Sequence, residues 1–115
     1  MRKIAVALVL GFLAFSPRIA VAQTHEHYLE ELAIEGADTP AKHEALAAHY
    51  HAKAADARAE AKRHEAMAKS YGRMAKPVQK GMMQQHCAKL AEDAKDEATQ
   101  YDGLAKAHED EAKKK

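Results

Sequence analysis

The sequence has few of the residues that build large cores and few of those that break helices. It has no tryptophan, two phenylalanines and four tyrosines among 115 residues. Proline occurs three times and glycine five times. A short chain with so few aromatic side chains buries little surface, which argues against a deep substrate pocket. The scarcity of helix breakers favours long helices, and no segment alternates in the manner of a β-strand.

Cysteine occurs once, as Cys87, so a disulfide within the chain is excluded. Charge of one sign is not in excess either, because 18 Lys and Arg balance 17 Asp and Glu. A balanced chain gives no electrostatic reason to expect a nucleic-acid partner. The sequence also has no nucleophile elbow, phosphate-binding glycine loop, paired-cysteine motif or zincin motif. We therefore expect no enzymatic activity.

The one long apolar run lies at the N-terminus. Arg2 and Lys3 precede an apolar stretch over residues 4–15, and residues 20–22 are Ala-Val-Ala. A basic start, an apolar stretch and a small-residue cleavage site predict a signal peptide over residues 1–22. Its removal would leave no stable membrane anchor, and we expect the protein to be periplasmic or secreted. The remaining 93 residues would contain all eight histidines.

Helix breakers divide the rest of the chain into two parts. Residues 36–40 include a glycine, an aspartate and a proline, and they separate an N-terminal segment (23–38) from the remainder (39–115). We expect a short helix over about residues 25–34 in the N-terminal segment.

Residues 39–115 are predicted to form two long helices. Thr39 as N-cap, followed by Pro40 in the first turn, is typical of a helix start. Pro77 is expected to end this helix, because proline is not tolerated in a helix interior. We therefore place the two helices at about residues 40–76 and 82–112.

Alanine recurs every seventh residue in both predicted helices, beside a second row that includes larger residues. A seven-residue repeat of core positions is the signature of a coiled coil. Folding the chain at the turn puts Tyr50 level with His108 and Tyr71 level with Cys87. The predicted fold is all-α, a long antiparallel helical hairpin with an alanine-rich seam. The alanine rows are Ala47, Ala54, Ala61, Ala68 and Ala75 in the first helix and Ala91, Ala98, Ala105 and Ala112 in the second.

A broken apolar strip flanks this seam. A two-helix hairpin with an alanine seam buries little, so we expect a partner element to cover the strip. The N-terminal helix could do so, or a second hairpin could complete a four-helix bundle. We favour self-association, and an envelope protein is the alternative partner. The strip consists of Leu46, Met67, Met74, Leu90 and Leu104.

Histidine is abundant, and a first candidate metal site lies at the predicted mature N-terminus. Cleavage after Ala22 would place His25 third, behind Gln23 and its free amine. The amine, two deprotonated backbone amides and the His25 imidazole would together place four nitrogens in a plane. This arrangement suits Cu(II) or Ni(II), and Zn(II) much less. His27 is near enough to add a ligand. Cyclisation of Gln23 would remove the amine, so the alternative is a histidine that is third by chance.

A second candidate site lies where the hairpin turns. Met82, Met83, His86 and Cys87 form two i,i+4 pairs, which share helix faces. Thioether, thiolate and imidazole groups together suit Cu(I). The alternative is packing, because methionine fills irregular gaps and Cys87 falls on the seam.

A third group of histidines gathers at the open end of the hairpin. His43, His49, His51 and His108 are expected within about two helical turns of one another. His43 and His108 fall on the seam, whereas His49 and His51 point elsewhere because residues two apart do not share a face. We expect weak Zn(II) or Cu(II) binding here at most. The alternative is that these histidines are solvated or fill the seam.

Behind the predicted export signal, the region from Gln23 to Ala112, with its alanine heptads and scattered His, Met and Cys, resembles a known type of protein. It is similar to the small exported, histidine-rich helical metal-binding proteins of Gram-negative bacteria. That resemblance implies buffering of copper and similar ions in the periplasm, and it transfers no ligand residue by residue. We expect a non-enzymatic protein that buffers or carries copper. The alternative is a structural or interaction hairpin of the cell envelope with no metal role.

Overall fold

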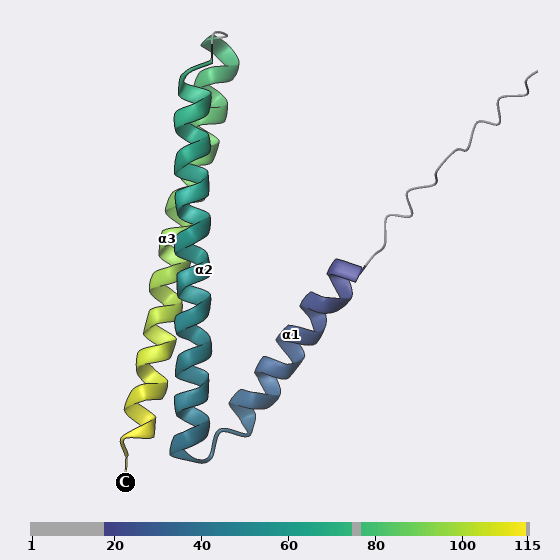
Figure 1. The fold of residues 1–115 in the computed structure, drawn as a ribbon, viewed down its shortest axis with the longest axis vertical. Coiled ribbons are helices and arrows are strands. Elements are labelled where there is room, and N and C mark those ends of the chain that lie inside the picture. The colour runs from purple at the N-terminus through teal and green to yellow at the C-terminus, as the bar shows by residue number, and fades with distance from the viewer. Residues whose placement is uncertain (1–17, 75–76, 115) are drawn as a thin grey trace, which may run out of the picture. The chain divides into compact units, whose positions relative to one another are not determined.

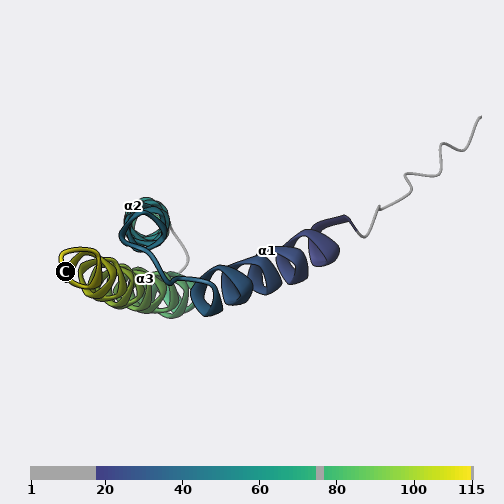
Figure 2. The same ribbon diagram turned by 90° about the horizontal axis from the view of Figure 1, so that it is seen from below.

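The computed structural model describes the backbone of residues 18–74 and 77–114, and the side chains of residues 26–74 and 81–114. The described residues form three helices and no strand, in the order α1 (Arg18–Glu35), α2 (Pro40–Gly72) and α3 (Pro77–Ala112). Helices α2 and α3 lie side by side and antiparallel, so the end of α3 lies beside the start of α2 (Figure 1 and Figure 2). The predicted all-α helical hairpin is confirmed.

Helix α1 contains the predicted short helix and begins seven residues earlier than expected, at Arg18. The first 17 residues of the predicted signal peptide lie outside the described residues. Within the part of the chain that the structure describes, no helix is long and apolar enough to cross a membrane.

Thr39 caps α2 as predicted. Its backbone is extended, and its hydroxyl accepts a hydrogen bond from the Lys42 backbone N–H at 3.3 Å. Lys42 also fastens the preceding loop, because its ammonium donates to the Gly36 carbonyl at 3.0 Å and to the Asp38 carboxylate at 2.6 Å. The hydrogen bond from Lys42 lowers the pKa of Asp38. These contacts fix where α2 begins.

The turn between α2 and α3 differs from the prediction on both sides. Helix α2 ends at Gly72, four residues before the predicted end, and α3 begins at Pro77, five residues before the predicted start. Glycine has a low helix propensity. The end of α2 is closed by the Arg73 N–H, which donates to the Ser70 carbonyl, and by the Met74 N–H, which donates to the Tyr71 carbonyl, both at 3.1 Å. Proline suits the first turn of a helix, where its missing N–H is not needed, so Pro77 starts α3.

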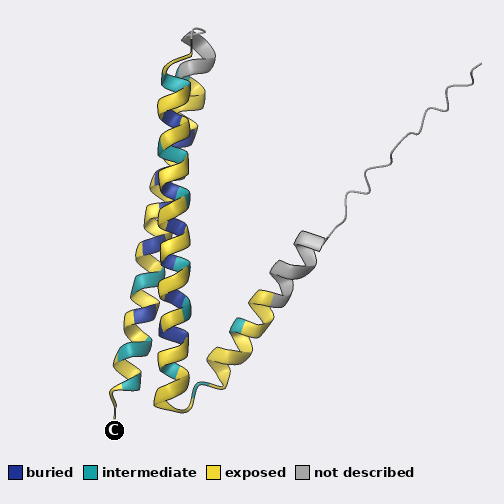
Figure 3. Ribbon diagram, viewed as in Figure 1, coloured by how far each residue is buried: buried dark blue, intermediate teal, exposed yellow. Residues whose placement is uncertain are grey.

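The seam between α2 and α3 is built on the predicted alanine rows. Ala54 and Ala105 are fully buried, and buried positions follow the facing sides of the two helices (Figure 3). The predicted register is confirmed at the open end, where the Tyr50 and His108 rings stack with their centroids 5.7 Å apart. The buried residues are Leu46, Ala47, Tyr50, Ala54, Ala57, Ala61 and Ala68 of α2 and Cys87, Ala91, Ala94, Ala98 and Ala105 of α3.

The two edges of the seam carry different side chains. Along the first, here called the ion-pair edge, side chains bridge the helices as Arg58–Asp102, Glu65–Lys95 and His51–Glu109. Along the second, here called the apolar edge, five large apolar side chains are 36–48% exposed: Met67, Met74, Met83, Leu90 and Leu104. Leu46, which was also predicted for this strip, is buried in a cluster with Tyr50 and Ala105.

Candidate metal site

The open end of the hairpin brings four ring side chains of α2 and α3 into one stack. The Nδ1 atoms of His43 and His108 lie 3.0 Å apart, and the two ring centroids are separated by 5.3 Å. On its other side the His108 ring stacks on Tyr50, which in turn lies 6.1 Å from Tyr101. The stack therefore runs His43, His108, Tyr50, Tyr101 and alternates between the two helices.

Heptad spacing produces this stack. His43 and Tyr50 are seven residues apart on α2, and Tyr101 and His108 are seven apart on α3, so each pair occupies one face of its helix. Because the helices are antiparallel, the two pairs interleave across the seam. Tyr50 is buried and Ala105 leaves space for the rings, so the half-buried histidines are held against a fixed neighbour.

Two imidazole nitrogens at 3.0 Å share a proton in the metal-free protein, one ring donating its N–H and the other accepting. A metal ion can replace that proton. With metal–nitrogen bonds of about 2.0–2.1 Å, a right angle at the metal separates the two nitrogens by about 2.9 Å, and a tetrahedral angle separates them by about 3.4 Å. The observed 3.0 Å lies between these two values and is also the ordinary length of an N–H···N hydrogen bond, so it is compatible with one shared ion and does not select the metal.

One carboxylate near the histidine pair, that of Glu111, is paired with Lys114. The pKa of Glu111 is lowered, mainly by its hydrogen bond with Lys114, and the nearby His43 and His108 lower it further. Because Lys114 already balances the charge of Glu111, this carboxylate is not counted as part of the site.

The other two histidines of this predicted group have different neighbours. His51 lies on the ion-pair edge, with Nε2 2.8 Å from Glu109 and Nδ1 3.7 Å from Asp102. The hydrogen bond with Glu109 raises the pKa of His51. His49 meets the Tyr50 ring edge-on, with centroids 5.4 Å apart. Among the described residues, no group of three or more His, Cys, Asp or Glu is placed to hold a metal ion. The structure thus brings together two of the four predicted ligands, His43 and His108.

The predicted ligands at the turn differ in exposure. Met82 is 54% exposed, Met83 is 36% exposed and His86 is also exposed, whereas Cys87 is a free thiol buried in the seam. Met82 and His86 share an outward face of α3 because they are four residues apart. Cys87 lies on the inward side, so the four predicted ligands are divided between solvent and seam.

The N-terminal site falls largely outside the described side chains. Gln23 and His25 lie within α1, but their side chains are among those that the structure does not describe. His27, the third predicted ligand, is exposed on α1. This site remains a prediction from the sequence.

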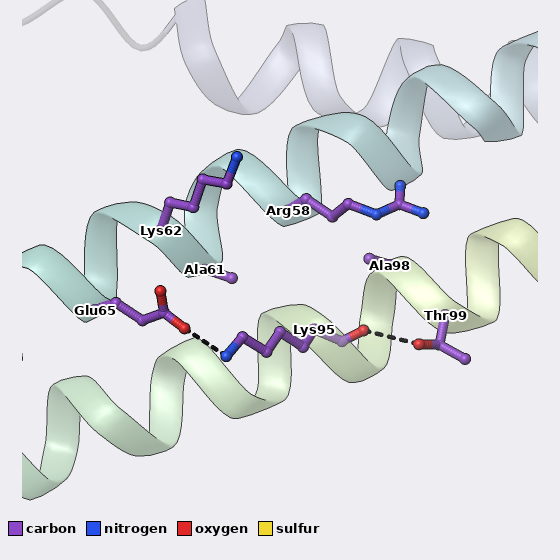
Figure 4. Close-up of a pocket in the computed structure, with 7 residues that line it drawn as sticks. All are labelled: Arg58, Ala61, Lys62, Glu65, Lys95, Ala98 and Thr99. Carbon is purple, nitrogen blue, oxygen red and sulfur yellow. Dashed lines mark hydrogen bonds and ion pairs between the residues drawn. The ribbon is translucent and has the colours of Figure 1, made fainter.

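A shallow groove follows the ion-pair edge. Alanine methyl groups form its floor, and the Lys95–Glu65 ion pair crosses it (Figure 4). The hydrogen bond with Lys95 lowers the pKa of Glu65. A second stretch continues past the same two residues toward the turn. The first stretch encloses about 370 Å³ and is lined by Arg58, Ala61, Lys62, Glu65, Lys95, Ala98 and Thr99. Because its central charges are already paired, we favour the histidine pair as the site.

Sequence reasoning placed His43 and His108 on the seam but did not identify Tyr50 and Tyr101 as their neighbours. The seven-residue spacing of each tyrosine from a histidine is the signal that identifies them. No protein-family model, curated protein or solved structure matches this chain, so the chemistry of the pair is deduced from the side chains themselves.

Proposed function

We propose that this chain is a non-enzymatic metal-binding protein, periplasmic or secreted, that buffers or carries copper. The observation that supports this proposal most directly is the 3.0 Å separation of the His43 and His108 Nδ1 atoms across the seam. Imidazole nitrogen binds Cu(II), Ni(II) and Zn(II), and Cu(II) is the tightest-bound of the three in the general affinity order of divalent metals. The export of the protein is supported by the N-terminal sequence alone.

A site with only two protein ligands suits a protein that passes its metal ion on to another molecule. His43 and His108 would leave the other coordination positions of Cu(II) to water or to a molecule that takes the metal away. Stacking on Tyr50 holds the His108 ring in place. Sites at the N-terminus for Cu(II) and at the turn for Cu(I) would add capacity, with nickel or zinc as alternative metals.

Calorimetric titration with Cu(II), followed by competition with Ni(II) and Zn(II), tests the open-end site. We expect His43→Gln to remove one bound Cu(II) per chain. His108→Gln should have the same effect, and the double variant should lose no more than either single variant, because both rings hold one ion.

His49→Gln is the matched control, because His49 lies near the pair but contacts the side of Tyr50. It should bind Cu(II) like the parent. Circular dichroism checks that each variant keeps its helices. A double variant of His43 and His108 that is folded and binds as many Cu(II) ions as the parent would eliminate this site.

The apolar edge favours a second candidate function, a structural or interaction hairpin with no metal role. Five large side chains remain 36–48% exposed there, and none of them is needed for the histidine pair. A parent protein that retains no metal in native mass spectrometry would favour this candidate over the first.

A further inference from the structure

The outward side of α2 is basic over the half of the helix that lies nearer the turn. It faces away from α3, because the buried seam residues Ala61 and Ala68 occupy the opposite side of α2. Its members follow one another at intervals of three or four residues, which places them on one side of a helix. All of them are exposed and none is acidic. This surface, here called the basic face, consists of Lys62, Arg63, Ala66, Lys69, Ser70 and Arg73.

Most of the charge on the basic face is not neutralised by neighbouring carboxylates. Arg63 pairs with Glu60, which lies beside the face. Among the side chains that the structure describes, none forms an ion pair with Lys62, Lys69 or Arg73. The basic face therefore presents three unneutralised cations along α2. From Lys62 to Arg73 it extends for about 16 Å, from the helical rise of about 1.5 Å per residue.

The acidic residues of the hairpin are concentrated on the other helix. Residues 58–73 contain five Lys and Arg and two Asp and Glu, whereas residues 92–111 of α3 contain two and eight. Packed helix axes lie about 8–10 Å apart, and the Debye length at physiological ionic strength is about 8 Å. An anionic surface in contact with the basic face is thus largely screened from the acidic residues of α3. The charge separation favours one orientation of the hairpin on such a surface.

We propose that the basic face of α2 binds the surface of an anionic lipid bilayer, with the hairpin lying along the membrane. Four Lys and Arg on one helix face are enough for attraction to anionic lipids, and each of them near the surface strengthens binding about fivefold. The binding is peripheral and reversible, because it depends on charge and inserts no apolar side chain. It does not depend on the proposed copper binding, which takes place at the other end of the hairpin.

The composition of the basic face favours a lipid surface over other anionic partners. A protein partner is usually bound through large aromatic or apolar anchors, but only Ala66 and Ser70 lie between the cations. Single-stranded nucleic acid is usually bound by stacking on aromatic side chains, and the face has none. A bilayer needs only a sufficient density of positive charge. The predicted export of the protein would also bring it to a membrane surface.

Cosedimentation with lipid vesicles tests the proposal, with the protein purified as the cell processes it. The parent should sediment with vesicles of phosphatidylcholine and phosphatidylglycerol in equal parts at low salt. It should stay in solution with vesicles of phosphatidylcholine alone, and added salt should release it from the anionic vesicles by screening. Lys62→Gln combined with Lys69→Gln should weaken binding about 25-fold, from a factor of about five for each lysine.

Lys106→Gln combined with Lys113→Gln is the matched control. It changes the net charge by the same amount, but at exposed positions near the end of α3, outside the basic face. The control should bind anionic vesicles like the parent, and circular dichroism checks that both variants keep their helices. A parent that stays in solution with anionic vesicles at low salt, or a control that loses as much binding as the first variant, would overturn the proposal. A parent that binds duplex DNA but no vesicle would overturn it as well.

Discussion

The two ends of the hairpin are held together by different means. At the open end, the buried residues include Leu46 and Tyr50, and four rings interleave between α2 and α3. Toward the turn, the buried positions are alanines and Cys87. One heptad pattern therefore supports two kinds of packing: large side chains that interlock, and small ones that let the helices approach closely.

This difference explains why the alignment of α2 along α3 is specified mainly at the open end. Alanine methyl groups are alike from one turn to the next, so a seam of alanines alone would tolerate a shift of seven residues. The stack of His43, His108, Tyr50 and Tyr101 fits in one register. The open end therefore aligns the helices, and the alanine seam sets how closely they approach.

The largest expected effect comes from removing the ring at the centre of the stack. Tyr50→Ala should lower the free energy of unfolding by about 3–5 kcal/mol, the usual cost of deleting a buried aromatic ring. Tyr71→Ala, at the half-buried ring near the turn, should cost about 1–2 kcal/mol because less of it is buried. Urea denaturation of both variants measures the difference. Equal losses would mean that the two ends do not differ.

Enlarging the alanine seam should have the next largest effect. Ala54 is fully buried, so Ala54→Leu should force α2 and α3 apart and cost about 1–3 kcal/mol. Ala66→Leu is the control, because position 66 is exposed on α2 and should change stability by less than about 0.5 kcal/mol. Thermal unfolding reports both. A seam that accepts leucine at position 54 without loss would not be closely packed.

The two ends of the hairpin should also differ in the metal ion that they bind. Cys87→Ser combined with Met82→Ala is expected to weaken Cu(I) binding at the turn by at least about tenfold. Loss of groups that only support metal ligands already weakens metal binding by about 10–100-fold, so loss of two ligands should cost at least the lower value. Cu(II) binding at His43 and His108 should not change. Competition with a chromophoric Cu(I) chelator measures the first effect, and Met67→Ala serves as the control. If the double variant binds Cu(I) like the parent, the turn-end site is discarded.

The smallest expected effect is a pH dependence at the open end. The hydrogen bond with Glu109 raises the pKa of His51 above its ordinary value of about 6.5. The stabilisation is therefore fully present below about pH 6.5 and is lost as the pH rises through the raised pKa. The parent should exceed His51→Gln in melting temperature at pH 5.5 and lose that advantage at pH 8.5. An advantage that grows with pH would show that the pKa of His51 is lowered in the folded protein and not raised.

Patterns with a fixed spacing allowed much of the fold to be predicted. The alanine heptads gave the hairpin and the level of Tyr50 with His108, and Thr39 gave the start of α2. The turn was less predictable, because a proline ends one helix or begins the next equally well, and Pro77 begins α3. The ion pairs that bridge α2 and α3 were also not predicted. Arg58–Asp102 and Glu65–Lys95 follow the predicted register, but the sequence does not indicate which of several nearby charges will pair.

The candidate site was predictable only in part, for a related reason. Spacing placed His43 and His108 on the seam, but their contact depends on how long side chains interleave between levels. His43 does not lie level with His108; it reaches toward it from the adjacent level, and Tyr50 supports the same ring from the other side. Such contacts require the three-dimensional offset of the two helices. The sequence repeat alone does not provide it.

The path of the chain through the hairpin also bears on how it opens. Near the turn, Gln84 lies beside Gly72, only a short loop away, whereas His43 and His108 are 65 residues apart in sequence. Short loops close at lower entropic cost than long ones, so contacts between α2 and α3 are expected to form first near the turn. A cation shared by His43 and His108 would join α2 and α3 at the end that is furthest from the turn. Amide exchange in the first turns of α2 and the last turns of α3 would then slow on metal binding, while exchange near the turn stayed the same.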